Sequence, residues 1–178
     1  MKVIKVKDKN FSLYIDSKEI DESVSKVAKE INRDLKGKNP LFIVILNGAF
    51  VFASDLIRKI TIDCEISFVK LSSYSGTKTT SVVRELIGLD ENLSDRHVVI
   101  VEDIIDTGIT MENTINKFKK LNAKDVKIAT LLFKPNSFLK DYNIDYIGLK
   151  IPNDFIVGYG LDYDGFGRNY PDIYKIVD

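Results

Sequence analysis

The chain has 178 residues, enough for one domain with a sizeable hydrophobic core. Its 26 basic and 26 acidic residues give a formal net charge of +0, which argues against a surface built mainly for nucleic acid or an anionic membrane. The single Cys64 excludes an internal disulfide, and neither a secretory signal nor a membrane-spanning apolar run is visible, so we expect a cytoplasmic protein.

The hydrophobic pattern predicts helices that alternate with strands. A helix is expected over residues 17–36, with Ser17 as its N-cap and Gly37 at its end. The next elements in chain order are a strand at 41–46, a helix at 50–60, a strand at 65–71, a hairpin arm at 82–87, and strands at 98–101, 126–133 and 146–149. This alternation predicts an α/β fold in which helices flank a parallel-centred twisted sheet.

We expect residues 1–178 to form one domain, because the remaining segments cannot complete a second one. The N-terminal residues and roughly residues 151–178 are expected to form a small hood over the strand ends. The near-zero net charge favours self-association, and we expect a homodimer or homotetramer.

The segment from 98 to 110 is the most informative part of the chain. A buried strand ends in the carboxylates of Glu102, Asp103 and Asp106, and a Thr-Gly turn then leads into a helix. In an open α/β sheet, ligands bind at this edge. Backbone amides at a helix N-terminus suit a phosphate, whereas carboxylates suit sugar hydroxyls or hydrated Mg²⁺. A ribose 5′-phosphate meets both requirements, although an ordinary connection with acidic capping has the same composition.

The motif Val-Glu-Asp-Ile-Ile-Asp-Thr-Gly-x-Thr, at 101–110, resembles the ribose-phosphate signature of type I phosphoribosyltransferases, in the form of the hypoxanthine-guanine branch. No Walker lysine is present, which disfavours a P-loop NTPase. The resemblance extends from about residue 41 to residue 176. It includes four further motifs in the right order: 46–48, 73–74, 132–134, and 155–163 followed by Arg168.

The resemblance implies the type I phosphoribosyltransferase fold and a reaction in purine salvage. The phosphoribosyl group passes from phosphoribosyl pyrophosphate to N9 of hypoxanthine or guanine, giving IMP or GMP and pyrophosphate, with Mg²⁺ as cofactor. One alternative is a transferase that prefers xanthine. Another is a non-catalytic, nucleotide-sensing regulator that binds RNA, but the balanced charge and the presence of Lys134, Asp162 and Arg168 argue against it.

The resemblance also assigns roles to single residues. Asp106 is expected to take the proton that the purine loses, and a simple N-cap is its alternative. Lys134 is expected to donate to O6 of the purine and thereby to reject adenine, whereas the alternative is a solvated lysine. The residues expected to bind ribose and phosphate are Glu102, Asp103, Asp106, Thr107, Gly108, Ile109 and Thr110.

The remaining assignments concern the purine, the metal and the pyrophosphate. Phe155 is expected to stack on the purine and Ile156 to offer backbone groups, although both are also plausible core residues. Asp162 is expected beside the purine and, with Glu102 and Asp103, to hold metal directly or through water. The expected pyrophosphate and lid residues are Leu46, Asn47, Gly48, Ser73, Tyr74 and Arg168. Many family members carry lysine where Asn47 stands, and this loop can contain a cis peptide in the family.

Overall fold

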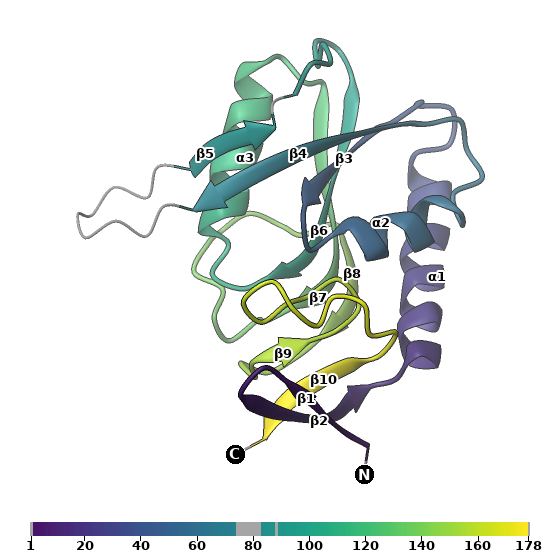
Figure 1. Ribbon diagram of the computed structural model, residues 1–178. Helices are drawn as coiled ribbons and strands as arrows, with labels where there is room; N and C mark the ends of the chain where they lie inside the picture. Colours follow the sequence, from purple (N-terminus) through teal and green to yellow (C-terminus); the bar gives the residue numbers. More distant parts are fainter. Residues whose placement is uncertain (1, 74–82, 88, 178) are drawn as a thin grey trace.

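The computed structural model describes residues 2–73, 83–87 and 89–177. Two β-sheets organise the molecule: a larger one that carries helices on both faces, and a smaller one at the end where both termini lie (Figure 1). The smaller sheet, together with the loop between its last two strands, is called the hood below.

The larger sheet has the strand order β5-β4-β3-β6-β7-β8. Its strands are β3 (Leu41–Leu46), β4 (Glu65–Ser73), β5 (Val83–Ile87), β6 (His97–Ile105), β7 (Asp125–Phe133) and β8 (Tyr146–Lys150). Five strands are parallel and β5 pairs antiparallel with β4 at the edge. The expected α/β fold class with a parallel-centred sheet is confirmed, and β3 begins and ends where the apolar run predicts.

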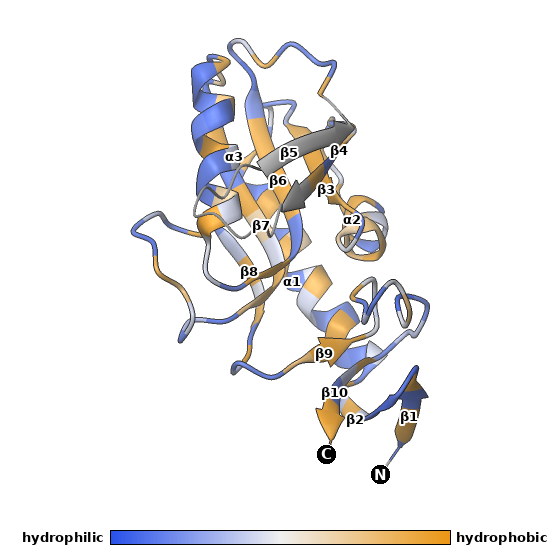
Figure 2. Ribbon diagram, turned by 60° about the vertical axis from the view of Figure 1, so that its left-hand side comes forward, coloured by the Kyte–Doolittle hydropathy of each residue, from blue (hydrophilic) through white to orange (hydrophobic). Residues whose placement is uncertain are grey.

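Helices bury both faces of this sheet. They are α1 (Ser17–Asp34), α2 (Phe50–Ile57) and α3 (Ile109–Lys120). Successive side chains of a strand point to opposite faces, so Phe42 and Val44 pack with α1 and α2, whereas Ile43 packs with α3. Strand β3 and the buried middle of β6 are therefore continuously apolar, as Figure 2 shows, because both of their faces are covered.

The chain changes direction across the sheet between β3 and β6. From β3 the chain continues to β4 on one side, whereas from β6 it continues to β7 on the other. The loops that follow β3 and β6, at residues 46–48 and 106–110, therefore leave the sheet side by side. This is the place where open α/β sheets bind ligands.

The hood sheet has the order β1-β2-β10-β9, and its strands come from both ends of the chain. They are β1 (Val3–Val6), β2 (Lys9–Ile15), β9 (Ile156–Val157) and β10 (Ile173–Val177). The buried carboxylate of Asp172 fastens the hood to α1, because it accepts hydrogen bonds from the Ser17 amide at 3.0 Å, Lys2 Nζ at 2.9 Å and the Tyr174 hydroxyl at 3.0 Å.

Three local expectations were wrong. The N-cap of α1 is Asp16, whose carboxylate accepts from the Glu19 amide, so Ser17 is already helical and α1 ends at Asp34. Helix α2 ends at Ile57, three residues early, because tighter turns follow it. Strand β6 continues to Ile105, since its ladder with β7 runs on to Phe133. Glu102 and Asp103 therefore lie in the strand and not in a loop. In the described residues, no helix is long and apolar enough to cross a membrane.

Candidate active site

The loop from Asp106 to Thr110 forms a ready anion site at the start of α3. Gly108 occupies the N-cap position in the left-handed region, with φ +79°, and has no side chain to cap the helix; the Ile109 amide makes only a long contact of 3.5 Å with Thr107 Oγ1. The amides of its first turn therefore remain available to a ligand. A pocket of about 220 Å³ is lined by Glu102, Ile104, Ile105, Asp106, Thr107, Gly108, Thr110 and Met111. Most of the predicted ribose-phosphate residues thus line one cavity.

A segment beyond β7 supports this loop from behind. The Tyr142 hydroxyl donates to the Gly108 carbonyl at 2.9 Å, and the Leu139 amide donates to the Thr107 carbonyl at 3.2 Å. A Cβ on Gly108 would lie 2.5 Å from the Phe138 ring and 2.7 Å from the Tyr142 hydroxyl. Only glycine fits this position. Sequence reasoning missed Phe138 and Tyr142, because nothing in their local pattern reveals that Gly108, 30 and 34 residues away, is their partner.

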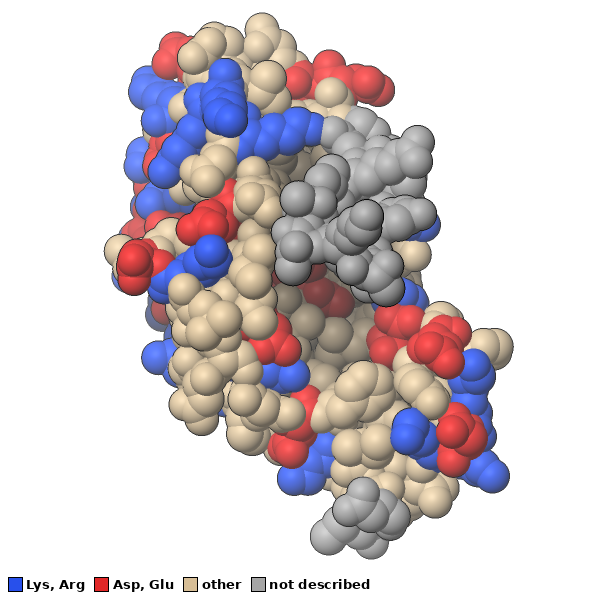
Figure 3. Space-filling view, turned by 90° about the vertical axis from the view of Figure 1, so that its left-hand side faces the viewer, with Lys and Arg blue, Asp and Glu red and all other residues tan. Residues whose placement is uncertain are grey.

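Glu102 and Asp103 place two carboxyl groups side by side at the end of β6. Burial and the neighbouring Asp103 charge raise the pKa of Glu102. Burial also raises the pKa of Asp103, while hydrogen bonds and the nearby Arg168 charge act against it. Two close, desolvated carboxyl groups favour a ligand that either donates hydrogen bonds to them or carries positive charge. A sugar diol or a hydrated cation fits that requirement. Figure 3 shows acidic side chains deep in a hollow on this face of the molecule.

The described residues contain no cluster of three or more His, Cys, Asp or Glu side chains that could hold a metal ion. Asp162 therefore does not join Glu102 and Asp103 in one protein-only metal centre. A cation at this site needs further oxygen ligands from substrate or water, which is the usual situation for Mg²⁺.

Asp106, which lines the pocket, pairs with Lys134. Lys134 Nζ lies 3.4 Å from Asp106 Oδ2, and the Lys134 amide donates to the Ile105 carbonyl. The Lys134 side chain is only 11% exposed, whereas that of Asp106 is 50% exposed. Lys134 is therefore not a solvated surface lysine. Asp106 does not cap α3 either, since Gly108 takes that place.

The loop after β3 touches both β6 and the hood. A Cβ on Gly48 would lie 1.7 Å from Asp103 Oδ2, and a Cβ on Gly160 would lie 2.2 Å from the Gly48 carbonyl oxygen. The peptide bond between Leu46 and Asn47 is cis, and Asn47 is exposed. Three segments that are far apart in the sequence thus converge at Gly48. Gly160 is a site residue that sequence reasoning missed, although its Gly-Tyr-Gly setting was a signal.

Asp162 and Arg168 lie together on the hood loop. Arg168 Nη2 lies 2.8 Å from Asp162 Oδ1, and Arg168 Nη1 donates to the Gly160 carbonyl at 2.6 Å. Asp162 Oδ2 also accepts from the Gly165 amide. Asp162 and Arg168, which the sequence assigned separate roles, therefore form one ion pair beside Gly160.

Phe155 lies at the edge of the hood with 45% of its surface exposed, so it is not a core residue. Its ring packs against Phe11 at 6.2 Å and edge-on against Tyr163 at 5.8 Å, measured between ring centroids. Ile156 is buried in β9. Ser73 is the last residue of β4, and Tyr74, the other expected lid residue, lies outside the described residues.

Comparison with known proteins decides the family. A family profile described as "Phosphoribosyl transferase domain" matches residues 14–164. The chain belongs to the phosphoribosyltransferase family. The resemblance drawn from its separated motifs is thereby confirmed.

The chain is 41% identical over 158 residues to the hypoxanthine-guanine phosphoribosyltransferase of Streptococcus pneumoniae (strain ATCC BAA-255 / R6), covering 88% of this chain and 84% of that one. It is 41% identical over 166 residues to the hypoxanthine phosphoribosyltransferase of Buchnera aphidicola subsp. Schizaphis graminum, covering 92% and 90%. Among solved structures, a hypoxanthine-guanine phosphoribosyltransferase from Bacillus anthracis matches with a TM-score of 0.87 and 39% identity, over 94% of this chain and 97% of that one.

Proposed function

We propose that this phosphoribosyltransferase acts in purine salvage and transfers the phosphoribosyl group from phosphoribosyl pyrophosphate to N9 of hypoxanthine or guanine. The products are IMP or GMP and pyrophosphate. The observation that carries the proposal is one pocket lined by Glu102, Asp106 and the start of α3, with the Asp103 carboxyl next to Glu102 and Lys134 paired with Asp106. The names of the relatives with about 41% identity point to the same substrates.

In this proposal the 5′-phosphate binds the amides and hydroxyls of residues 107–110. The amides of the first turn of α3 and its dipole favour negative charge, and Tyr142 keeps the Gly108 carbonyl turned away from the ligand. The ribose diol faces Glu102 and Asp103, which accept its hydrogen bonds. The ribose is then held at both ends, so that its anomeric carbon faces the purine.

Asp106 is the proposed general base. As N9 attacks the anomeric carbon and the bond to pyrophosphate breaks, the purine ring must lose a proton, and the exposed Asp106 carboxylate accepts it near N7. Lys134 holds this carboxylate in place through a contact of 3.4 Å. On purine binding, Lys134 Nζ donates to O6. Adenine presents an amino donor there, which leaves two donors facing each other and rejects that base.

Arg168 and the Gly48 amide are the proposed contacts for pyrophosphate. A guanidinium matches the fork of phosphate oxygens, and Arg168 is already aimed by its bonds to Asp162 and Gly160. Mg²⁺, when bound, supplies positive charge that offsets the charge on the leaving group. Glu102, Asp103 and Asp162 are its proposed protein contacts, directly or through water.

Phe155 offers a half-exposed aromatic face for the purine, and backbone groups near Ile156 read the edge at C2. Selection at C2 separates guanine from xanthine, so a xanthine preference is the second candidate, tested in the same assay. We further propose that the protein works in the cytoplasm, as its single cysteine suits a reducing compartment, and that it forms a homodimer or homotetramer.

The test is a transfer assay with phosphoribosyl pyrophosphate, Mg²⁺ and each of the four bases. We expect nucleotide formation with hypoxanthine and guanine, much slower transfer to xanthine, and none to adenine. Preferred turnover of xanthine would replace the proposal by the second candidate. No turnover of any 6-oxopurine would contradict it.

A further inference from the structure

The hood loop at residues 158–162 carries an unusual backbone. Gly158 and Gly160 have φ values of +104° and +95°, which glycine tolerates. Tyr159 between them has φ +48°, a left-handed conformation that is uncommon for a bulky residue. Such conformations persist only where the surrounding structure holds them, and they cluster at functional sites. A specific contact must therefore hold Tyr159 in this left-handed conformation.

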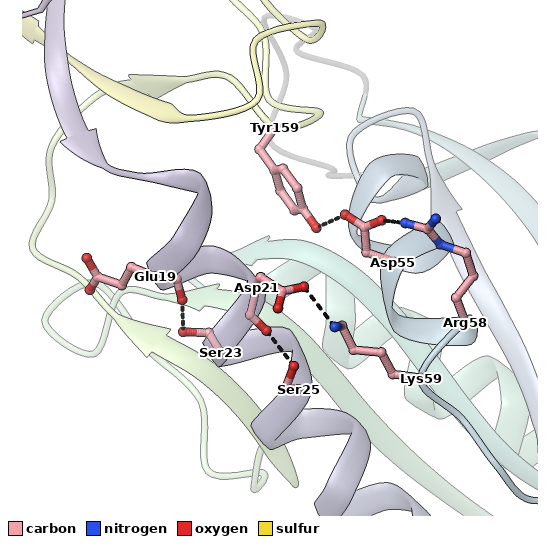
Figure 4. Close-up of polar contacts among 8 residues, drawn as sticks. All are labelled: Glu19, Asp21, Ser23, Ser25, Asp55, Arg58, Lys59 and Tyr159. Carbon is pink, nitrogen blue, oxygen red and sulfur yellow. Dashed lines mark hydrogen bonds and ion pairs between the residues drawn. The ribbon is translucent and has the colours of Figure 1, made fainter.

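The hydroxyl of Tyr159 provides that attachment. It donates a hydrogen bond of 2.6 Å to Asp55 Oδ2 on α2, and the same carboxylate also pairs with Arg58 one helical turn further on (Figure 4). The Tyr159 side chain is buried, and the charge of Asp55 strengthens the bond. A pocket of about 540 Å³ opens beside this pair between α1, α2 and the hood. The hydrogen bond thus connects the hood to α2 beside a cavity that side chains do not fill.

The attachment reaches the pyrophosphate contacts through the main chain. The Tyr159 amide donates to the Tyr170 carbonyl at 2.8 Å, and the next amide, that of Gly160, donates to the Arg168 carbonyl at 3.0 Å. The Arg168 guanidinium in turn donates to the Gly160 carbonyl. Gly160 itself lies against the Gly48 carbonyl. A shift of Tyr159 would therefore move Arg168 and open the contact between Gly160 and Gly48.

The α2 end of the link is equally direct. Helix α2 begins two residues after Gly48, and Asp55 lies in its second turn. Asp55 is thus rigidly connected to the loop after β3, while Tyr159 belongs to the hood. We propose that Asp55 and Tyr159 are positioning residues that lock Arg168 and Gly48 at the spacing that pyrophosphate requires. This inference rests on the proposed pyrophosphate role of Arg168 and Gly48.

Tyr159→Phe tests the inference, because it removes the hydroxyl and keeps the ring. We expect the KM for phosphoribosyl pyrophosphate to rise about tenfold, as the lost bond to a charged group predicts, while kcat and the KM for hypoxanthine change less than about twofold. The dissociation constant of Mg²⁺-pyrophosphate, measured by calorimetry, should rise by the same factor. Tyr146→Phe is the matched control: its buried hydroxyl has no hydrogen-bond partner in the described part of the chain, so both constants should stay unchanged.

A double-mutant cycle measures whether Asp55 and Tyr159 act together on the KM for phosphoribosyl pyrophosphate and on pyrophosphate affinity. A purely structural role would leave both constants unchanged. Asp55→Ala should raise the same two constants, and the double variant should be no worse than either single one. Asp55→Asn keeps an acceptor for the hydroxyl and should recover most of the affinity. Asp55→Asn can also replace Tyr159→Phe in the test if circular dichroism shows that the tyrosine variant folds poorly.

Two outcomes would overturn the inference. Equal pyrophosphate binding by the wild type and Tyr159→Phe, with only the unfolding temperature lowered, would show that the pair is merely structural, and the proposed function would stand. If the wild type itself binds no Mg²⁺-pyrophosphate, the proposed pyrophosphate site fails and the inference falls with it.

Discussion

The segment from β6 to α3 and the hood contribute to the same site in different ways. The β6–α3 segment supplies the carboxyl pair, Asp106 and the amides proposed to bind phosphate within nine consecutive residues, 102–110. The hood supplies Phe155 next to β9, and Asp162 and Arg168 from a loop whose shape depends on contacts with α1 and α2. Local sequence therefore determines the first half of the site, whereas tertiary contacts determine the second.

The two halves also differ in what holds them. Strand β6 is paired with β3 on one side and with β7 on the other. At the start of α3, the Phe138 and Tyr142 side chains leave no space for a Cβ at Gly108. The hood is joined to α1 by Asp172 and to α2 by Tyr159, and its apolar residues Ile156, Leu161 and Ile173 share the hydrophobic cluster of those helices. We therefore expect chemical variants of the segment to abolish turnover and variants of the hood to change affinity or stability.

The largest expected effect comes from removal of divalent cations, because both halves then face an anionic leaving group without added positive charge. Thorough chelation should abolish nucleotide formation in the transfer assay, and excess Mg²⁺ should restore it fully. Excess Ca²⁺-saturated chelator serves as the control for direct inhibition by the reagent. Full turnover after chelation would show that the reaction does not require a divalent cation.

Asp106→Asn should have the next largest effect. It keeps the shape of the side chain and its contact with Lys134 but removes the base, so kcat should fall by about 10² to 10⁴-fold. The KM for phosphoribosyl pyrophosphate should change far less. Single-turnover kinetics separate the chemical step from product release. An unchanged rate in that experiment rejects Asp106 as the base.

Gly108→Ala tests the fit of the phosphate loop. The new Cβ would meet Phe138 and Tyr142, so the loop must shift and the KM for phosphoribosyl pyrophosphate should rise about tenfold. Gly37→Ala is the matched control, since Gly37 has a similar φ of +74° but nothing within 4 Å of a Cβ. Both variants should lose about 1–2 kcal/mol of stability from backbone strain, but the control should keep its KM. Equal KM values for the two would show that the loop tolerates displacement.

Asp172→Asn probes the anchor of the hood and has a defined pH dependence. The hydrogen bond from Lys2 lowers the pKa of Asp172 below its ordinary value of 3.8. A carboxyl whose pKa is depressed by folding stabilises the chain fully above the unfolded pKa, and this contribution is lost as the pH falls through the folded pKa. At pH 7 the variant should be about 1–3 kcal/mol less stable than the wild type in urea unfolding.

The difference between Asp172→Asn and the wild type should shrink as the pH falls below about 4. Asp164→Asn is the control, because its pair with Lys7 is exposed and contributes little. A stability difference that stays constant from pH 7 to pH 3 would show that the charge of Asp172 does not anchor the hood.

Sequence alone predicted the parts of this molecule that depend on local pattern. The apolar run at 41–46 predicted β3 without error, and most of the residues that the 101–110 motif singled out line one pocket, whose ribose-phosphate role stays a prediction. The parallel sheet followed from the alternation of strands and helices. The end of β6 was missed because Glu102 and Asp103 look like loop residues, while the ladder with β7 keeps them in the strand.

The rest of the site depends on contacts that no local pattern encodes. Tyr142 reaches Gly108 across 34 residues, and Tyr159 reaches Asp55 across 104. The pairing of Asp162 with Arg168 likewise depends on a tight loop held by left-handed glycines. Such contacts become predictable only when the fold has brought the segments together.

The most direct test of the account is a crystal structure of the protein with IMP. We predict that the 5′-phosphate lies within hydrogen-bond distance of the amides of residues 107–110, that the ribose diol faces Glu102 and Asp103, and that Lys134 contacts O6. A phosphate bound elsewhere on the molecule, with this loop empty, would contradict the central claim.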